Sequence, residues 1–289
     1  MIRQIKSQIY PLILLVLLLL SGCITVATPG DKDITYHKIA RSAKFEKAHL
    51  KTKYFTLTTF YRFTKPGEPI NIYIEGDGNA WISRMRLSGN PTPRNLLVLK
   101  LATIDASVNV AFLARPGQYT EQQIPNVEPA YWSDKRFSEE VITSMSEAIG
   151  ELAQLAKTNE INLIGYSGGG AVAVLIAARR NDIVSLRTIA GNLDIEAVNK
   201  YHNVSRLSGS LNPIDFAKNL KGLPQRHFIS SKDTVVPSSI AESFVKRMGD
   251  KDYFRITEVT GATHSKGWTN HWKELLEYPV SKARLPANN

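Results

Sequence analysis

One short glycine-rich turn restricts the possible fold of this chain more than any other feature of its sequence. In "INLIGYSGGGAVAVLIAARR" (161–180), a β-branched apolar run leads to Ser167, and an alanine-rich run of helical character follows. Gly165 and Gly169 stand two residues before and two after the serine, which matches G-x-S-x-G. When a strand turns this sharply into a helix, these two positions pack against each other and must be small. The segment therefore predicts a strand–turn–helix joint with Ser167 at the helix N-terminus, where backbone N–H groups and the helix dipole favour negative charge. The alternative is a joint whose glycines serve packing alone.

The rest of the chain alternates between strand-like and helix-like segments. Strands are predicted at 53–63, 69–78, 107–117, 161–166, 184–191, 226–231 and 252–259. Helices are predicted at 94–105, 138–157, 169–180, 239–249 and 266–278, with Ser138 as the N-cap of the second. This alternation is typical of an α/β domain with a mostly parallel sheet and helices on both faces. Residues 192–225 lack a clear period and predict a short cap or loop insertion.

A serine becomes a strong nucleophile only beside a base, and the base needs an acid that orients it. Asp233 directly follows the strand predicted at 226–231, and His264 follows the strand predicted at 252–259. Both positions lie beyond the carboxyl ends of strands, where open α/β sheets bind ligands. We therefore predict a catalytic triad of Ser167, Asp233 and His264. Other residues fit these roles less well, namely the acids Asp182, Asp194 and Asp215 and the histidine His202.

Two backbone N–H groups are predicted to bind the oxyanion that forms when the serine attacks a carbonyl. One belongs to Gly168, directly after the serine, and the other to Asp77 in the glycine turn "EGDGNAW" (75–81). We expect the Asp77 carboxylate to turn away from the anion or to bond locally; the alternative is that this stretch is only an exposed turn. Aromatic side chains near these turns could line an acyl pocket or anchor loops, and the candidates are Trp81, Tyr119 and Tyr166.

The first 23 residues are typical of an export signal. Arg3 and Lys6 precede "PLILLVLLLL" (11–20), which is shorter than the roughly 20 residues that a membrane-spanning helix needs. "LSGC" (20–23) resembles the lipobox of bacterial lipoproteins, whose cysteine is acylated and becomes the new N-terminus. The resemblance implies a signal peptide over 1–22, a lipid on Cys23 and a lipid-anchored tether over 23–50. It places the protein at the bacterial cell envelope, on the outer membrane in a Gram-negative host. The alternative is an ordinary signal with a chance cysteine.

Charge and composition narrow the range of partners. The net charge is +10, and removal of residues 1–22 takes away two bases and no acid, which leaves +8. A basic envelope protein lies readily on anionic lipid or polysaccharide surfaces. There is no dense Lys/Arg run with interleaved aromatics, no H-E-x-x-H and no Cys/His cluster. We therefore expect no nucleic acid, no metal and no cofactor.

Three motifs in a fixed order carry a family resemblance. "GYSGG" (165–169), "SSKDTVVP" (230–237) and "GATHSKGW" (261–268) resemble the α/β-hydrolase family, over residues 51–289. "EGDGNAW" (75–81), "ARPGQY" (114–119), "YWSDKRFS" (131–138) and "LSGSLNP" (207–213) are similar to a group of exported bacterial hydrolases. Many relatives carry His-Gly where this chain has Glu75-Gly76, and the difference bears on the second oxyanion donor.

The resemblance implies an α/β-hydrolase fold and hydrolysis through an acyl-serine intermediate. The expected substrate is a small molecule with a carboxylic ester or related acyl bond. A peptidase, an amidase or a thioesterase would use the same triad and remains an alternative. A second alternative is a non-catalytic envelope binding module that retains the hydrolase fold.

Overall fold

The computed structural model describes residues 29–121 and 125–280. The chain divides into two units, residues 1–35 and 36–289, and the second contains both hydrophobic cores. The proposed signal peptide and Cys23 lie outside the described residues. None of the helices in the described residues is both long and apolar enough to span a membrane.

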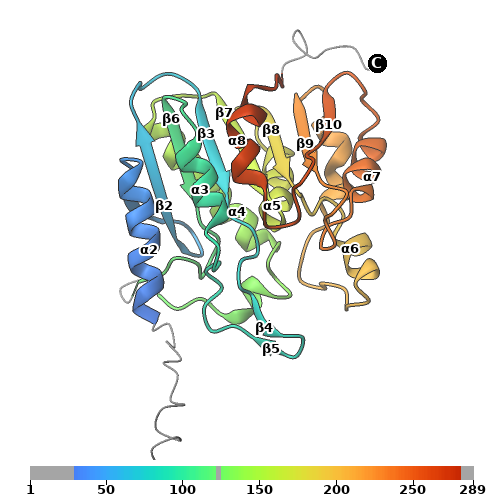
Figure 1. The fold of residues 1–289 in the computed structure, drawn as a ribbon, viewed down its shortest axis with the longest axis horizontal. Coiled ribbons are helices and arrows are strands. Elements are labelled where there is room, and N and C mark those ends of the chain that lie inside the picture. The colour runs from blue at the N-terminus through green and yellow to red at the C-terminus, as the bar shows by residue number, and fades with distance from the viewer. Residues whose placement is uncertain (1–28, 122–124, 281–289) are drawn as a thin grey trace, which may run out of the picture. The chain divides into compact units, whose positions relative to one another are not determined.

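An eight-stranded sheet forms the centre of the second unit (Figure 1). The strand order is β1-β2-β6-β3-β7-β8-β9-β10. The strands are β1 (Glu46–Lys51), β2 (Thr56–Phe63), β3 (Ile70–Ile74), β6 (Asn109–Leu113), β7 (Ile161–Tyr166), β8 (Ile183–Ile189), β9 (Gln225–Ile229) and β10 (Phe254–Glu258). β1 and β2 are antiparallel to their neighbours, and the strands from β6 to β10 in this order are parallel. Because β6 and β7 flank β3 on opposite sides, the direction of winding reverses at β3, and open sheets of this kind bind ligands at such a point.

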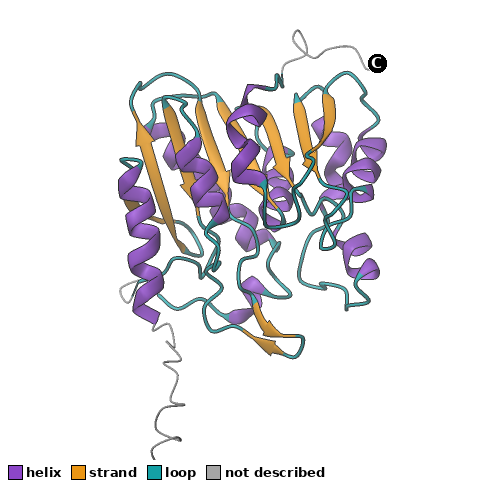
Figure 2. Cartoon of the chain, in the orientation of Figure 1, coloured by secondary structure: helices purple, strands orange, loops and turns teal. Residues whose placement is uncertain are grey.

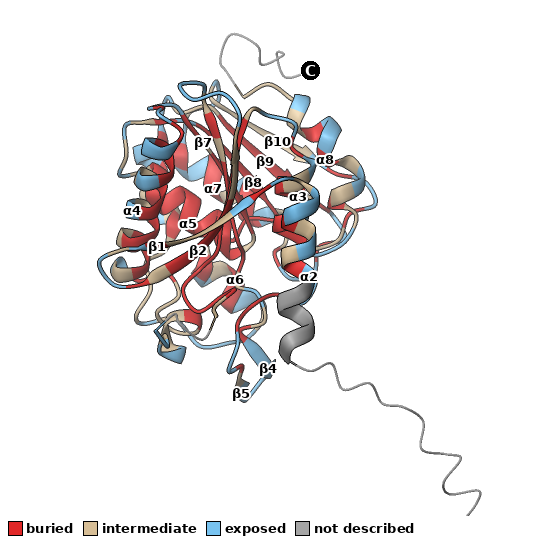
Figure 3. Cartoon of the chain, turned by 90° about the vertical axis from the view of Figure 1, so that its left-hand side faces the viewer, coloured by how far each residue is buried: buried red, intermediate tan, exposed pale blue. Residues whose placement is uncertain are grey.

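Helices cover both faces of the sheet (Figure 2). They are α2 (Pro29–Ser42), α3 (Leu97–Ile104), α4 (Glu139–Leu155), α5 (Gly168–Ala177), α6 (Ile195–Tyr201), α7 (Ser239–Met248) and α8 (Trp268–Glu277), with 3-10 helices η1 (Pro129–Trp132) and η2 (Pro213–Leu220). One core contains side chains of α3 and α8, including the fully buried Trp268 and Trp272, and the other contains side chains of α4, α5 and α7. Every residue of α5 is buried, which fixes the helix that follows Ser167 firmly against the sheet (Figure 3). Ser138 caps α4 by accepting the Val141 N–H, as the sequence predicts.

The folded region begins earlier than the sequence indicates. Residues 36–50, predicted as part of a tether, contribute the end of α2 and the edge strand β1. Tyr36 and Ala40 are buried in one core and Leu50 in the other. The tether prediction was therefore wrong for this stretch. The reason is physical: "EKAHLK" is an edge strand, and edge strands carry charged residues that hide the alternation on which recognition depends.

The predicted insertion at 192–225 is only partly a loop region. It contains α6 and η2, and η2 packs beside α5 and α7 with Ala217 and Leu220 buried. A short hairpin that the sequence did not reveal, β4 (Trp81–Ser83) and β5 (Arg86–Leu87), extends from the segment after β3 (Figure 1).

Candidate active site

Ser167 occupies a strained turn between β7 and α5. Its φ of 52° and ψ of −120° form a combination that side-chain-bearing residues rarely adopt. Hydrogen bonds hold the turn: the Ser167 N–H donates to the Ile189 carbonyl at 2.9 Å, and the Ser167 carbonyl accepts the N–H groups of Gly170 and Asn192.

The turn depends on its two small residues. A Cβ added to Gly165 would lie 2.3 Å from the Gly169 carbonyl oxygen, and one added to Gly169 would lie 2.3 Å from the Ile74 carbonyl oxygen. The expectation that these two positions must be small is confirmed.

The three residues predicted as a triad lie in one hydrogen-bonded line. Ser167 Oγ is 3.1 Å from His264 Nε2, and His264 Nδ1 is 2.8 Å from Asp233 Oδ2. The Asp233 side chain is 1% exposed and the His264 side chain 16% exposed. A buried carboxylate on one ring nitrogen leaves the other facing the serine, which is the arrangement that lets an imidazole accept a proton from a hydroxyl.

The loops after β9 and β10 fix the acid and the histidine. Asp233 Oδ1 accepts the N–H groups of Val235 and Val236 at 2.8 and 2.9 Å, which leaves Oδ2 for the histidine. The His264 carbonyl accepts the Tyr166 hydroxyl at 3.0 Å and the Trp268 indole N–H at 2.9 Å. The backbone that carries the imidazole is thus bonded to both β7 and α8.

The two residues predicted to supply the oxyanion donors are in contact. A Cβ added to Gly168 would lie 2.0 Å from Asp77 Oδ1, so the Asp77 side chain rests directly against the first residue of α5. Within residues 29–121 and 125–280, no hydrogen bond occupies the backbone N–H of Gly168 or of Asp77.

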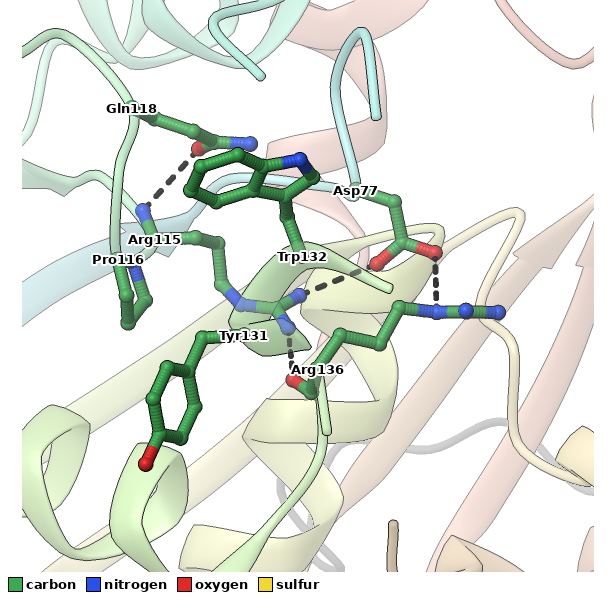
Figure 4. A pocket seen from close by; sticks show the side chains of 7 residues that line it. All are labelled: Asp77, Arg115, Pro116, Gln118, Tyr131, Trp132 and Arg136. Carbon is green, nitrogen blue, oxygen red and sulfur yellow. Dashed lines mark hydrogen bonds and ion pairs between the residues drawn. The ribbon is translucent and has the colours of Figure 1, made fainter. Parts of the chain in front are cut away.

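Two arginines neutralise the Asp77 carboxylate (Figure 4). Arg115 Nη1 lies 3.3 Å from Asp77 Oδ1, and Arg136 Nε lies 3.1 Å from Asp77 Oδ2. Arg115 is itself buried and also donates to the Arg136 carbonyl. The Asp77 carboxylate thus pairs with distant segments of the chain. From the sequence, it was instead expected to turn away from the anion or to bond locally. Arg115 and Arg136 lie within the motifs "ARPGQY" (114–119) and "YWSDKRFS" (131–138), but the sequence alone gave neither residue a role beside Asp77.

A buried carboxyl lies next to the oxyanion loop. Glu75 Oε1 accepts the Gly76 N–H at 2.9 Å, and Glu75 Oε2 accepts the Tyr119 hydroxyl at 2.9 Å. Burial raises the pKa of the Glu75 carboxyl to about 7, although the two hydrogen bonds and the Arg115 charge oppose the rise. Many hydrolases have a His-Gly pair at this position. In this chain the first residue of the pair is Glu75, whose side chain is hydrogen-bonded to the loop through the Gly76 N–H.

The three aromatic residues predicted to line a pocket have different positions. Tyr166 lies beside the His264 imidazole, and the two ring centroids are 5.3 Å apart. Tyr119 is 1% exposed and its hydroxyl donates to Glu75, which matches the alternative of a loop anchor and not that of a pocket residue. Trp81 is 46% exposed on the β4–β5 hairpin. The pocket of Figure 4 is lined by Asp77, Arg115, Pro116, Gln118, Tyr131, Trp132 and Arg136.

Two of the three competing acids, Asp182 and Asp194, and the competing histidine have other partners. Asp194 caps α6, and Asp182 pairs with Arg180. His202 Nε2 lies 2.7 Å from the Val235 carbonyl, on the loop that carries Asp233. In the described part of the chain, no group of three or more His, Cys, Asp or Glu side chains is arranged to hold a metal ion.

Comparison with known proteins identifies the fold. No protein-family model matches the sequence, and no curated protein matches it either. An esterase from Pyrococcus furiosus superposes with a TM-score of 0.58 and 14% identity, over 86% of this chain and 91% of that one. An acylaminoacyl peptidase from Pyrococcus horikoshii superposes with a TM-score of 0.59 and 14% identity, over 85% of this chain and 43% of that one. A bacterial membrane phospholipase A superposes with a TM-score of 0.56 and 12% identity, over 93% of this chain and 98% of that one. The chain therefore has the α/β-hydrolase fold, as predicted from the sequence.

Proposed function

We propose that the protein is a serine hydrolase that cleaves carboxylic ester or related acyl bonds through an acyl-serine intermediate. The observation that carries the proposal is the line of hydrogen bonds from Ser167 through His264 to Asp233, built on a strained turn at the start of a buried helix. A turn of this kind costs free energy, about 1–3 kcal/mol for the backbone strain alone, and such strain is concentrated at functional sites.

The geometry supports a two-step reaction. Ser167 Oγ attacks the substrate carbonyl while His264 Nε2 takes its proton, and Asp233 stabilises the imidazolium that results. The carbonyl oxygen becomes an anion between the N–H groups of Gly168 and Asp77. Collapse of this intermediate breaks the bond to the leaving group, which receives the proton from His264 Nε2. A water molecule then attacks the acyl-serine by the same steps and releases the acid.

The charges around the oxyanion loop support this assignment. A carboxylate beside an oxyanion would oppose the reaction, but the Asp77 carboxylate faces the guanidinium groups of Arg115 and Arg136. The two guanidinium groups and the N-terminus of α5 offset the Asp77 carboxylate beside the developing charge.

Esters are the proposed substrates because an alcohol leaves more readily than an amine. The similar structures include an esterase and a phospholipase A, which supports this choice, and an acylaminoacyl peptidase, which keeps a peptidase as the alternative. The proposed location is the bacterial cell envelope, through a lipid on Cys23 and a short tether that ends before Tyr36. It is supported by the signal and lipobox pattern of residues 1–23.

The first experiment is covalent labelling with a fluorophosphonate probe. The chain from residue 24 onward is suitable because both cores lie within residues 36–280. We expect the probe to label this protein and not its Ser167→Ala variant, after which a panel of acyl esters, thioesters and amides defines the bond type. A folded wild-type protein that resists the probe would contradict the proposal and favour a non-catalytic binding module.

A further inference from the structure

We propose that Gln118 is a positioning residue, which orients the peptide group between Gly76 and Asp77 so that its N–H faces the oxyanion. The inference rests on the proposed function, since it assigns a role to one residue within that site. Gln118 lies in the loop after β6 and touches neither the serine nor the histidine in any hydrogen bond of the described residues.

The hydrogen bond that carries the inference joins Gln118 to the other end of the proposed donor's own peptide. Gln118 Nε2 donates to the Gly76 carbonyl oxygen at 2.9 Å. That carbonyl and the Asp77 N–H belong to one planar peptide group, and the bond is trans, as are all peptide bonds of the described residues. In a trans peptide the C=O and the N–H point in opposite directions. A donor that holds the carbonyl on one side therefore holds the N–H toward the other.

The Gln118 amide is itself fixed in orientation. Gln118 is 2% exposed, and its Oε1 accepts the Arg115 backbone N–H at 3.1 Å, which leaves Nε2 to face the Gly76 carbonyl. Gly78 makes room for it, because a Cβ at that position would lie 2.7 Å from Gln118 Nε2 and 2.1 Å from the Pro91 carbonyl oxygen. The donor is thus built into the loop by its neighbours on both sides.

The preceding peptide group is fastened as well. The Gly76 N–H donates to the Glu75 side chain at 2.9 Å, so two successive peptide planes have side-chain partners. A hydrogen bond to a carbonyl also polarises its peptide and makes the N–H a stronger donor. Gln118 therefore acts on the oxyanion in two ways, through the direction and through the strength of the Asp77 N–H.

The test compares two buried glutamines. Gln118→Met removes the donor at nearly constant shape, and Gln225→Met does the same at the start of β9, where the fully buried Gln225 amide donates to the Leu220 carbonyl at 3.2 Å. We expect Gln118→Met to lower kcat about 10- to 100-fold with KM changed less than about threefold, because a displaced donor weakens binding of the transition state and not of the substrate. Gln225→Met should retain kcat within about threefold.

Two further measurements separate positioning from a general loss of structure. Affinity for a boronic acid that mimics the tetrahedral intermediate should fall in parallel with kcat/KM in Gln118→Met. The pH at which kcat/KM is half-maximal should not move, because His264 and Asp233 are unchanged. A folded Gln118→Met with kcat within about threefold of wild type, or a loss that appears only in KM, would overturn the inference.

A second variant serves if Gln118→Met does not fold. Gln118→Glu keeps an acceptor for the Arg115 N–H but offers the Gly76 carbonyl no proton once its carboxyl ionises. We expect its kcat, relative to wild type, to fall as the pH is raised. If the ratio of the kcat of Gln118→Glu to that of wild type stays within about threefold of one at every pH, the role of Gln118 is contradicted. A wild-type protein that neither hydrolyses esters nor reacts with the phosphonate would instead contradict the proposed function itself.

Discussion

The two sides of the active site are built by different means. On the nucleophile side, Ser167, Asp233 and His264 each follow one strand. Backbone groups of the turn, of β8 and of the loop after it hold Ser167, and backbone N–H groups of its own loop hold Asp233. On the oxyanion side, the loop after β3 is held by side chains from the loop after β6 and from the segment before α4. The nucleophile side thus depends mainly on backbone bonds near the strand ends, and the oxyanion side depends on side chains from distant segments.

The difference extends to the role of charge. The nucleophile side has one buried acid, Asp233, whose partners are two backbone N–H groups and the histidine. The oxyanion side buries Glu75 and Arg115 around Asp77, and buried charges are tolerated only when each is paired or neutral. We expect changes to Ser167, Asp233 or His264 to abolish chemistry without unfolding, and changes on the oxyanion side to affect rate, stability and pH dependence together.

The largest effect should come from Asp233→Asn. If the asparagine oxygen keeps the bonds to the N–H groups of Val235 and Val236, its NH2 group must face His264 Nδ1. The histidine would then carry its proton on Nε2, toward the serine, and could not act as base. A fall in kcat of about 10⁴-fold follows, with a near-native midpoint of thermal unfolding. An active variant, measured by ester hydrolysis over a range of pH, would contradict the assignment of Asp233.

Gly168→Ala tests the junction between the two sides. The new Cβ would lie 2.0 Å from Asp77 Oδ1, so the carboxylate must leave its place between the arginines. We expect kcat to fall about 10- to 100-fold, because the Asp77 backbone moves with its side chain.

Gly150→Ala is the matched control for this change. It makes the same substitution within α4, where the nearest atom would be Arg180 Nη1 at 3.6 Å. Its kcat should not change, and its stability should rise slightly because alanine favours helix. Equal rates for both variants would show that Asp77 can move without cost.

The Glu75→Gln variant tests how the buried Glu75 carboxyl contributes to the pH dependence of folding stability. The pKa of Glu75 is about 7 in the fold and 4.5 in its ordinary state, so the folded protein holds the proton more tightly. Stability from the neutral carboxyl is fully present below pH 4.5 and is lost as the pH rises through 7, on the order of 3 kcal/mol in total. Denaturant unfolding of both proteins at pH 5 and pH 8 should show wild type losing stability relative to Glu75→Gln. The same difference at both pH values would mean that Glu75 does not titrate in this range.

The sequence predicts the nucleophile side well and the oxyanion side poorly. Ser167, Asp233 and His264 follow β7, β9 and β10, which the strand–helix alternation predicts, and a parallel sheet brings the carboxyl ends of such strands to one edge. The contacts of Gln118 and Arg115 with the loop after β3 depend on β6 lying next to β3, and strand order cannot be read from periodicity. The roles of Arg136 and Gln118 could therefore not be predicted, although the two residues lie in the motifs "YWSDKRFS" and "ARPGQY", and Glu75 was visible as a departure from the His-Gly pair.

The predicted start of the folded region was wrong for a similar reason. β1 pairs with β2 through its backbone, and its side chains alternate only weakly between buried and exposed. Pairing through the backbone needs no particular residue type, so a polar edge strand resembles a tether in sequence. The core strands were found because burial on both faces demands apolar residues.

The smallest effect should come from Tyr166→Phe, on the nucleophile side. The Tyr166 hydroxyl donates to the His264 carbonyl at 3.0 Å, but the Trp268 indole donates to the same oxygen at 2.9 Å. Loss of the hydroxyl therefore leaves that carbonyl satisfied and the imidazole in place, and we expect kcat to change less than about threefold. Stability should fall by about 0.5–1.5 kcal/mol, the net value of one hydrogen bond. A hundredfold fall in kcat in steady-state assays would mean that the position of His264 depends on the Tyr166 side chain, as the oxyanion loop depends on side chains from distant segments. The contrast between the two sides would then be wrong.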